Sequence, residues 1–213
     1  MHDILKRAVL SSGLLCLMAC SQILGPGNEE DLATASEKSC GFVQNSYGQR
    51  VSWRPTVVTV YHSESIPENM KHSLQVAAQV WESILGRKIF AFESLPASEA
   101  LVPRKDGRNA LILLSDWPDS ARHVQAITNV YYTGAQITEA DIKVNMQDFS
   151  YSEEPLLNQA DVHLASLLLH ELGHALGLQH LEQLPTVMWP LLEPNVIRMK
   201  PSDQDRENIK CEY

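Results

Sequence analysis

The stretch from residue 170 to residue 180, HELGHALGLQH, carries three histidines and one glutamate at fixed spacings. His170 and His174 are four residues apart, so on a helix their imidazoles project from the same face. Two imidazoles placed in this way can bind one Zn²⁺ ion. Glu171 is rotated from His170 by about 100° around a helix, so it is placed to act as a general base and not as a ligand. The spacing therefore predicts a hydrolytic metal site.

The end of the same stretch predicts a third ligand. Gly177 is expected to end the helix, because glycine readily takes the left-handed conformation that turns the chain. Three residues later, His180 can fold back and complete a three-histidine site. His163 lies too far along the helix to share the metal, and we expect it in the cleft or on the surface. His62 is expected to be solvated.

Hydrophobic patterns predict the elements that must position these residues. Predicted strands cover residues 56–62, 88–92, 109–114, 124–132 and 141–146. Predicted helices cover residues 67–85, 159–177 and 202–211. Asn158 and Asp161 have the spacing of an N-cap and its N3 partner, which places the start of the second helix. The order of the elements indicates a sheet backed by helices in one α/β or α+β domain.

The first twenty residues have the pattern of an export signal. Lys6 and Arg7 precede an uncharged apolar run over residues 8–19, which is too short to span a bilayer as a helix. The run ends in LMAC, which resembles the lipobox of bacterial lipoproteins and implies cleavage before Cys20 and a lipid on its thiol. We therefore expect a signal peptide at 1–19, a lipidated flexible tether at 20–49 and a folded domain at 50–213. An ordinary secretory signal is the alternative.

The resemblance to lipoproteins also implies a location. The chain is expected outside the cytoplasm, anchored by lipid to a bacterial membrane. Ser21 follows the lipidated cysteine, where an Asp would retain some lipoproteins in the inner membrane, so the outer membrane is expected if the organism has one. Cys40 and Cys211 then remain near the two ends of the mature domain in an oxidising compartment, and a disulfide between them is the simplest account.

The spacing HExxHxxGxxH resembles that of the metzincin zinc peptidases, and the sequence after it resembles their matrixin branch. Met188 follows His180 by eight residues within PTVMWP, as in the methionine turn of matrixins. Asp205, Ile209 and Tyr213 are similar to the end of a matrixin catalytic domain. The resemblance implies an α+β metzincin fold: a twisted, mostly parallel five-stranded sheet with one antiparallel edge strand, plus three helices.

The resemblance also implies roles for individual residues. His170, His174 and His180 would hold one catalytic zinc, Glu171 would be the general base, and Met188 would lie beneath the metal. The walls of a substrate pocket would come from Trp189, Pro190 and Leu191, for which plain packing in the core and turn is the alternative. An extended peptide or protein would pair with the edge strand near residues 125–132. The domain is expected to act as a monomer.

Two departures from the matrixin pattern matter. The short upstream segment contains KSCGF and no PRCGVPD propeptide, so a Cys40–Cys211 disulfide is favoured over Cys40 as a latency switch. The stretch at residues 115–123 has a single histidine, so a structural zinc or calcium site is not expected.

These patterns favour a zinc-dependent endopeptidase. A zinc hydrolase acting on cell-wall peptides and a zinc-bearing binding lipoprotein without activity are the alternatives, although a purely structural site would have no use for Glu171. The formal net charge of −9 argues against a nucleic-acid partner.

Overall fold

The structure is a computed structural model that describes residues 38–54, 57–153, 158–183 and 185–213. The predicted signal peptide, Cys20 and most of the predicted tether lie outside the described residues. Among the helices that the structure describes, none has the length and apolar character needed to cross a bilayer.

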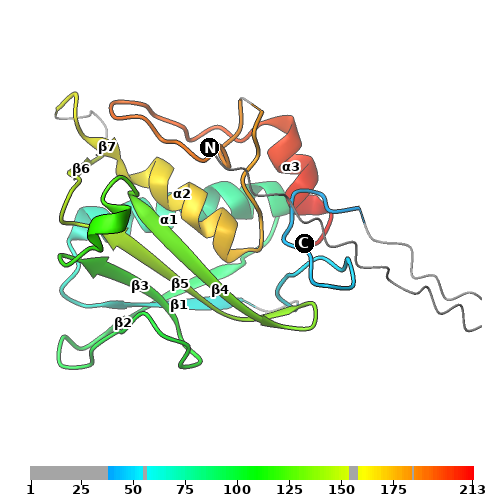
Figure 1. The fold of residues 1–213 in the computed structure, drawn as a ribbon, viewed down its shortest axis with the longest axis horizontal. Helices are drawn as coiled ribbons and strands as arrows, with labels where there is room; N and C mark the ends of the chain where they lie inside the picture. The colour runs from blue at the N-terminus through cyan, green and yellow to red at the C-terminus, as the bar shows by residue number, and fades with distance from the viewer. Residues whose placement is uncertain (1–37, 55–56, 154–157, 184) are drawn as a thin grey trace, which may run out of the picture. The chain divides into compact units, whose positions relative to one another are not determined.

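A five-stranded sheet in the order β2-β1-β3-β5-β4 forms one layer of the domain (Figure 1). The strands are β1 Val58–Ser63, β2 Phe90–Leu95, β3 Asn109–Leu114, β4 Ala126–Thr133 and β5 Gln136–Asn145. All neighbours pair in parallel except β4, which is antiparallel to β5 and lies at the edge. The predicted mostly parallel sheet with one antiparallel edge strand is confirmed.

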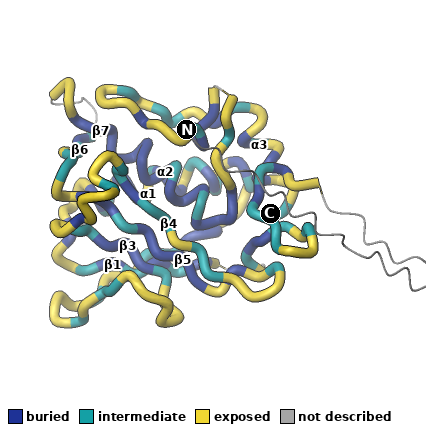
Figure 2. The backbone as a smooth tube through the Cα atoms, viewed as in Figure 1, coloured by how far each residue is buried: buried dark blue, intermediate teal, exposed yellow. Residues whose placement is uncertain are grey.

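Three helices accompany the sheet: α1 Glu68–Leu85, α2 Leu164–Ala175 and α3 Asp203–Lys210. Figure 1 shows α1 and α2 on the same side of the sheet, and Figure 2 shows that α2 is buried along most of its length. The apolar stripe of α1 faces α2, and the indole N–H of Trp81 donates to the carbonyl of Leu169 at 2.9 Å. Gly86 ends α1 in the left-handed conformation, with φ at 68°. The predicted bounds of α1 are confirmed within one residue.

The start of α2 was predicted wrongly. The helix begins at Leu164, five residues later than expected, because the short strands β6 Tyr151–Ser152 and β7 Val162–His163 pair in parallel just before it. Asp161 does not cap the helix. Its carboxylate is buried and accepts the hydroxyl of Ser150 at 2.7 Å. The N-cap is His163, whose ring accepts the backbone N–H of Ser166.

The folded domain also begins earlier than predicted. Cys40 and Phe42 are buried, so the predicted boundary at residue 50 places part of the domain in the tether. The predicted Cys40–Cys211 disulfide is present. Next to it, the Arg50 guanidinium and the Glu212 carboxylate form an ion pair at 2.6 Å. The two ends of the described domain are therefore held together by a covalent bond and by charge.

β5 begins five residues before the predicted strand, and this extension places two carboxyl groups in the interior. Glu139 and Asp141 are each 1% exposed. The Glu139 carboxylate accepts the backbone N–H groups of Asp106 and Gly107. One oxygen of Asp141 accepts the backbone N–H of Ala110 at 3.2 Å, while the other is buried without a hydrogen-bond partner in the described part of the chain. Burial, followed by the charge of Glu139, raises the pKa of Asp141 to about 7.

This raised pKa predicts how stability depends on pH. An unfolded Asp titrates near pH 4, so between about pH 4 and pH 7 the folded state binds more protons than the unfolded state. The contribution of the protonated Asp141 carboxyl group to the free energy of unfolding is therefore fully present below pH 4 and is lost as the pH rises through 7. Asp141→Asn should remove this loss and raise the free energy of unfolding at pH 8 by on the order of 1–4 kcal/mol relative to the wild type. Urea unfolding of both proteins at pH 5 and pH 8 tests this prediction. If the free energy of unfolding changed between these pH values by the same amount in the variant and in the wild type, the prediction would be wrong.

Candidate metal centre and cleft

The three predicted histidine ligands meet at one point. His170 and His174 project from the same face of α2, and the chain returns after Gly177, whose φ of 99° makes the turn. The Nε2 atoms of His170, His174 and His180 lie 3.0–3.2 Å from one another. They form the one group of three or more potential metal ligands within the described ranges.

The second nitrogens of the rings determine where the protons are. Nδ1 of His170 faces the carbonyl of Val187 at 2.8 Å, and Nδ1 of His174 faces the carbonyl of Leu178 at 2.8 Å. A carbonyl only accepts, so in the neutral ring each Nδ1 carries the proton and each Nε2 presents a lone pair. Lone pairs that converge in this way repel one another unless a cation lies between them.

The spacing of the three nitrogens fits zinc. Tetrahedral ligands at 2.0–2.1 Å from a zinc ion are roughly 3.3 Å apart, close to the separations observed here. Burial lowers the pKa of His170 to about 3 and also lowers the pKa of His174 and His180. Neutral imidazole is the form that binds a metal, so the surroundings of these rings favour the state that binding requires.

The turn that carries His180 is fixed by the start of the domain. The backbone N–H of Val43 donates to the carbonyl of Gly177 at 2.9 Å, and that of Gln179 donates to Gly41 at 2.7 Å. Phe42 forms an isolated antiparallel bridge with Leu178. The third histidine therefore depends on a segment about 140 residues away in the sequence.

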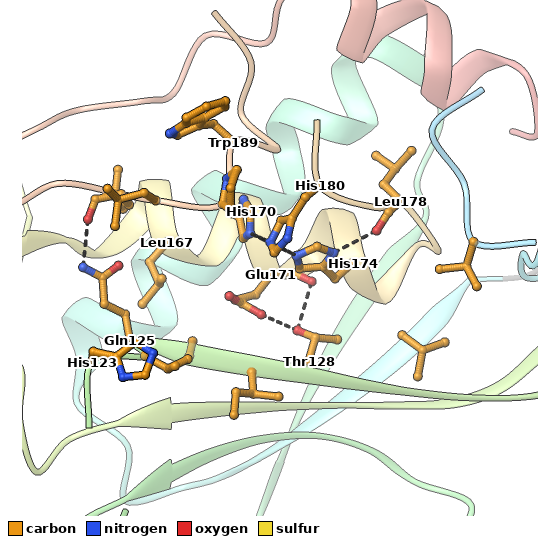
Figure 3. Close-up of a pocket in the computed structure, with 18 residues that line it drawn as sticks. His123, Gln125, Thr128, Leu167, His170, Glu171, His174, Leu178, His180 and Trp189 are labelled. Atoms are coloured by element: carbon orange, nitrogen blue, oxygen red, sulfur yellow. Dashed lines mark hydrogen bonds between the residues drawn. The ribbon is translucent and has the colours of Figure 1, made fainter. Parts of the chain in front are cut away.

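Glu171 lies beside the histidines and lines the same cavity (Figure 3). The residue is only 4% exposed, and burial raises the pKa of its carboxyl group to about 7. Its Oε2 atom accepts the hydroxyl of Thr128, on β4, at 2.6 Å. A carboxyl group with a pKa near neutrality can both accept and return a proton, as a general base requires.

Met188 packs against α2, the helix that carries His170 and His174. It is 1% exposed, and its sulfur lies so close to Gly173 that a Cβ atom at this position would collide with it. The carboxylate of Asp205 holds the turn by accepting the Thr186 hydroxyl and, at 3.0 Å, the backbone N–H of Val187. The methionine thus packs against the back of the helix that carries His170 and His174.

The contact between Gly173 and Met188 makes a prediction with an unusual sign. Glycine to alanine within a helix normally stabilises it by roughly 1 kcal/mol. Here the added methyl group collides with the Met188 sulfur and approaches the Trp81 ring. Gly173→Ala should therefore lower the free energy of unfolding by about 1–3 kcal/mol. Chemical denaturation tests this, and a variant more stable than the wild type would contradict it.

A cavity of about 560 Å³ lies between β4, α2 and the segment that follows Met188. The predicted pocket residues Trp189, Pro190 and Leu191 all line it, and Leu191 is 57% exposed. Most of the other lining side chains are apolar, among them Val124, Ala126, Ile127, Leu167 and Leu192. Gln125, which directly precedes β4, also lines the cavity. Its side chain donates to the carbonyl of Leu192 at 2.8 Å and so links the start of β4 to the opposite wall (Figure 3).

Several functional or supporting residues were not recognised from the sequence. Thr128 reaches Glu171 only through the packing of β4 against α2. Arg198 donates to the carbonyls of Trp189 and Leu191 at 3.3 and 2.8 Å and so braces the cavity wall. The predictions for two histidines were wrong, because His62 and His163 are both buried and hydrogen-bonded. The sequence pattern does not mark any of these hydrogen bonds.

The part of the chain that carries this site is similar to a known protein family. The sequence model of the matrixin family matches residues 124–213, from the cleft-edge strand to the C-terminus. The match includes the three histidines, Glu171 and Met188. It supports the assignment of the chain as a matrixin-like metzincin, and the matrixin family implies a metallopeptidase that uses zinc. No curated protein matches the chain.

Proposed function

We propose that this chain is a zinc-dependent endopeptidase that cleaves extended peptide segments. The observation that carries the proposal is the buried carboxyl group of Glu171 beside three converging imidazoles, in the wall of a cleft. A purely structural metal site needs the imidazoles but not this carboxyl group. His170, His174 and His180 would hold the zinc, which would supply a Lewis acid that polarises a carbonyl and lowers the pKa of water.

The residues of the chain would perform the proton transfers. Glu171 would accept a proton from the attacking water and then return it to the nitrogen of the departing amine. The hydrogen bond from Thr128 occupies one oxygen of the carboxylate. His170 and His174 would keep their protons on Nδ1, and each Nδ1–H would donate to a backbone carbonyl. These hydrogen bonds fix the orientation of both rings.

The cleft suits a chain that passes through it. In the part of the chain that the structure describes, β4 pairs only with β5, so one side of its backbone could accept an extended peptide by β-augmentation. The cavity beside it would take one apolar side chain of the substrate between Leu167 and the wall at 189–192. This arrangement favours cleavage within a peptide over removal of a terminal residue.

The two alternatives differ from this proposal in substrate or in activity. A cell-wall hydrolase would use the same groups on peptides of peptidoglycan, and a binding lipoprotein would use the zinc without chemistry. The location proposed from the sequence is outside the cytoplasm, with a lipid on Cys20 anchoring the chain to a bacterial membrane, the outer membrane if the organism has one. This location is compatible with all three functions.

The choice of substrate distinguishes the proposed endopeptidase from the cell-wall hydrolase. The zinc-loaded domain should cleave a denatured protein into internal fragments, and a chelator should stop the cleavage until zinc is restored. Fragments can be read by mass spectrometry. Release of products from purified peptidoglycan alone would replace the proposed substrate with the cell wall, and no product from either would favour the binding protein.

A further inference from the structure

Among the described residues, the hydroxyl of Thr128 makes the one side-chain hydrogen bond to Glu171. The distance from its Oγ1 to Oε2 of Glu171 is 2.6 Å, and the same Oγ1 lies 3.3 Å from the backbone carbonyl of Glu171 (Figure 3). A hydroxyl has one proton, so the shorter contact is the stronger hydrogen bond. A hydrogen bond to an ionised carboxylate is also stronger than one to a neutral carbonyl.

The backbone and the side chain of Thr128 both have little freedom to move. Its backbone is held in the ladder with β5, where it lies opposite Ile142. Threonine is branched at Cβ and has few accessible rotamers, whereas a glutamate side chain has three rotatable bonds. Asn129, the next residue, is exposed, consistent with side chains that alternate between the two sides of β4.

The rest of the Glu171 carboxylate is left for chemistry. Its Oε1 atom makes no hydrogen bond to another described residue, and Glu171 lines the cavity that also contains the histidine cluster. A carboxylate that is anchored by one oxygen can present the other in a fixed direction. Fixed placement of a reacting group can contribute on the order of 100-fold to a rate.

We propose that Thr128 is a positioning residue, which holds the general base Glu171 in its working orientation through the hydrogen bond from Oγ1 to Oε2. The inference rests on the proposed endopeptidase function. The proposal adds a residue of the edge strand β4 to the groups that act in the reaction. The Thr128–Glu171 hydrogen bond also connects β4 to α2, the helix that carries His170 and His174.

Two substitutions at Thr128 test the positioning role. Thr128→Val keeps the shape but removes the hydroxyl, and it should lower kcat for peptide cleavage by about 10–100-fold with KM changed less than about threefold. Thr128→Ser should recover most of kcat. Both variants should bind zinc as the wild type does. Thr138→Val is the matched control, because this threonine on β5 is exposed and its hydroxyl donates to the Tyr131 carbonyl. It should leave kcat unchanged.

A double-mutant cycle separates an effect through Glu171 from a general loss of structure. Thr128→Val should lower the midpoint of thermal unfolding by about 3 °C or more in the wild type but not in a Glu171→Leu background. Equal losses in the two backgrounds would overturn the proposal. An unchanged kcat in Thr128→Val, or a serine variant no better than valine, would also overturn it. If the wild type cleaves no peptide, the proposed function fails, while the stability cycle still decides whether the contact positions Glu171.

Discussion

Replacing Glu171 with glutamine should lower kcat for peptide cleavage by about 10²–10⁴-fold, the range typical of a lost general acid or base. Glutamine has nearly the same shape and can still accept the hydrogen bond from Thr128, but it cannot take a proton from water. The three histidines are untouched, so the variant should contain as much zinc as the wild type. Steady-state kinetics and metal analysis on the same preparation provide the two measurements.

A second glutamate provides the control for this substitution. Glu182 lies two residues after His180 and is exposed, so Glu182→Gln changes the net charge by the same amount near the metal site. It should keep the wild-type kcat. A Glu171→Gln variant that retains both zinc and full activity would remove Glu171 from the proposed mechanism.

Loss of the Cys40–Cys211 disulfide should have the largest effect on stability. The bond joins residues 171 positions apart, and the chain-entropy estimate for such a loop is about 5 kcal/mol, with native disulfides typically contributing 2–5 kcal/mol. The double variant Cys40→Ser/Cys211→Ser should therefore lose about 2–5 kcal/mol of the free energy of unfolding. Urea denaturation of the zinc-free proteins measures this loss. A free energy within 1 kcal/mol of the wild type would contradict it.

The same variant should also bind zinc more weakly. Release of Cys40 loosens the segment that includes Gly41 and Val43, and this segment holds the turn at Gly177–Gln179 before His180. We expect the zinc dissociation constant to rise by about tenfold, which corresponds to a coupling of about 1.4 kcal/mol. Competition with a chromophoric chelator measures it. Reduction of the wild type should reproduce the change, because Cys211 is exposed to solvent. Equal affinities with and without the disulfide would show that the segment does not support His180.

The sequence predicted the metal-binding part of the site because its geometry is local. Ligands four residues apart on a helix and a glycine that ends the helix need no knowledge of the rest of the chain. α1 was predictable for the same reason, since its apolar residues repeat at helical spacing and Gly86 follows them. Elements whose signals lie within a few turns were therefore placed correctly.

Elements that depend on distant partners were not predictable. Asp161 has the spacing of a capping residue, but its carboxylate binds Ser150 and the true cap is His163. β5 is buried on both faces near its middle and contains the buried charged residues Glu139 and Asp141, so the usual alternation of apolar and polar residues did not mark its start. The polar residues before position 50 hid the anchors Cys40 and Phe42 in the same way. In each case tertiary contacts outweighed the local pattern.

The residues of the cleft wall could be predicted only in part. Trp189, Pro190 and Leu191 could be assigned because they follow Met188 directly, in a turn that resembles that of the matrixins. Thr128 could not be assigned, because its partner Glu171 lies on another element. Arg198 could not be assigned, because nothing in the sequence shows that its side chain turns back to the carbonyls of Trp189 and Leu191. Spacing alone predicted that the three histidines and Glu171 come together, but not which residues hold them in place.

The central claim is that the site at His170, Glu171, His174 and His180 cleaves internal peptide bonds. The most direct test is to incubate a library of random peptides with the zinc-loaded wild type and with Glu171→Gln, and to sequence the products by mass spectrometry. The account predicts cleavage at internal bonds by the wild type, with an apolar residue enriched on one side of the cut, and at least 100-fold less product from the variant. Wild-type protein with one zinc per chain that leaves every internal bond intact would contradict it.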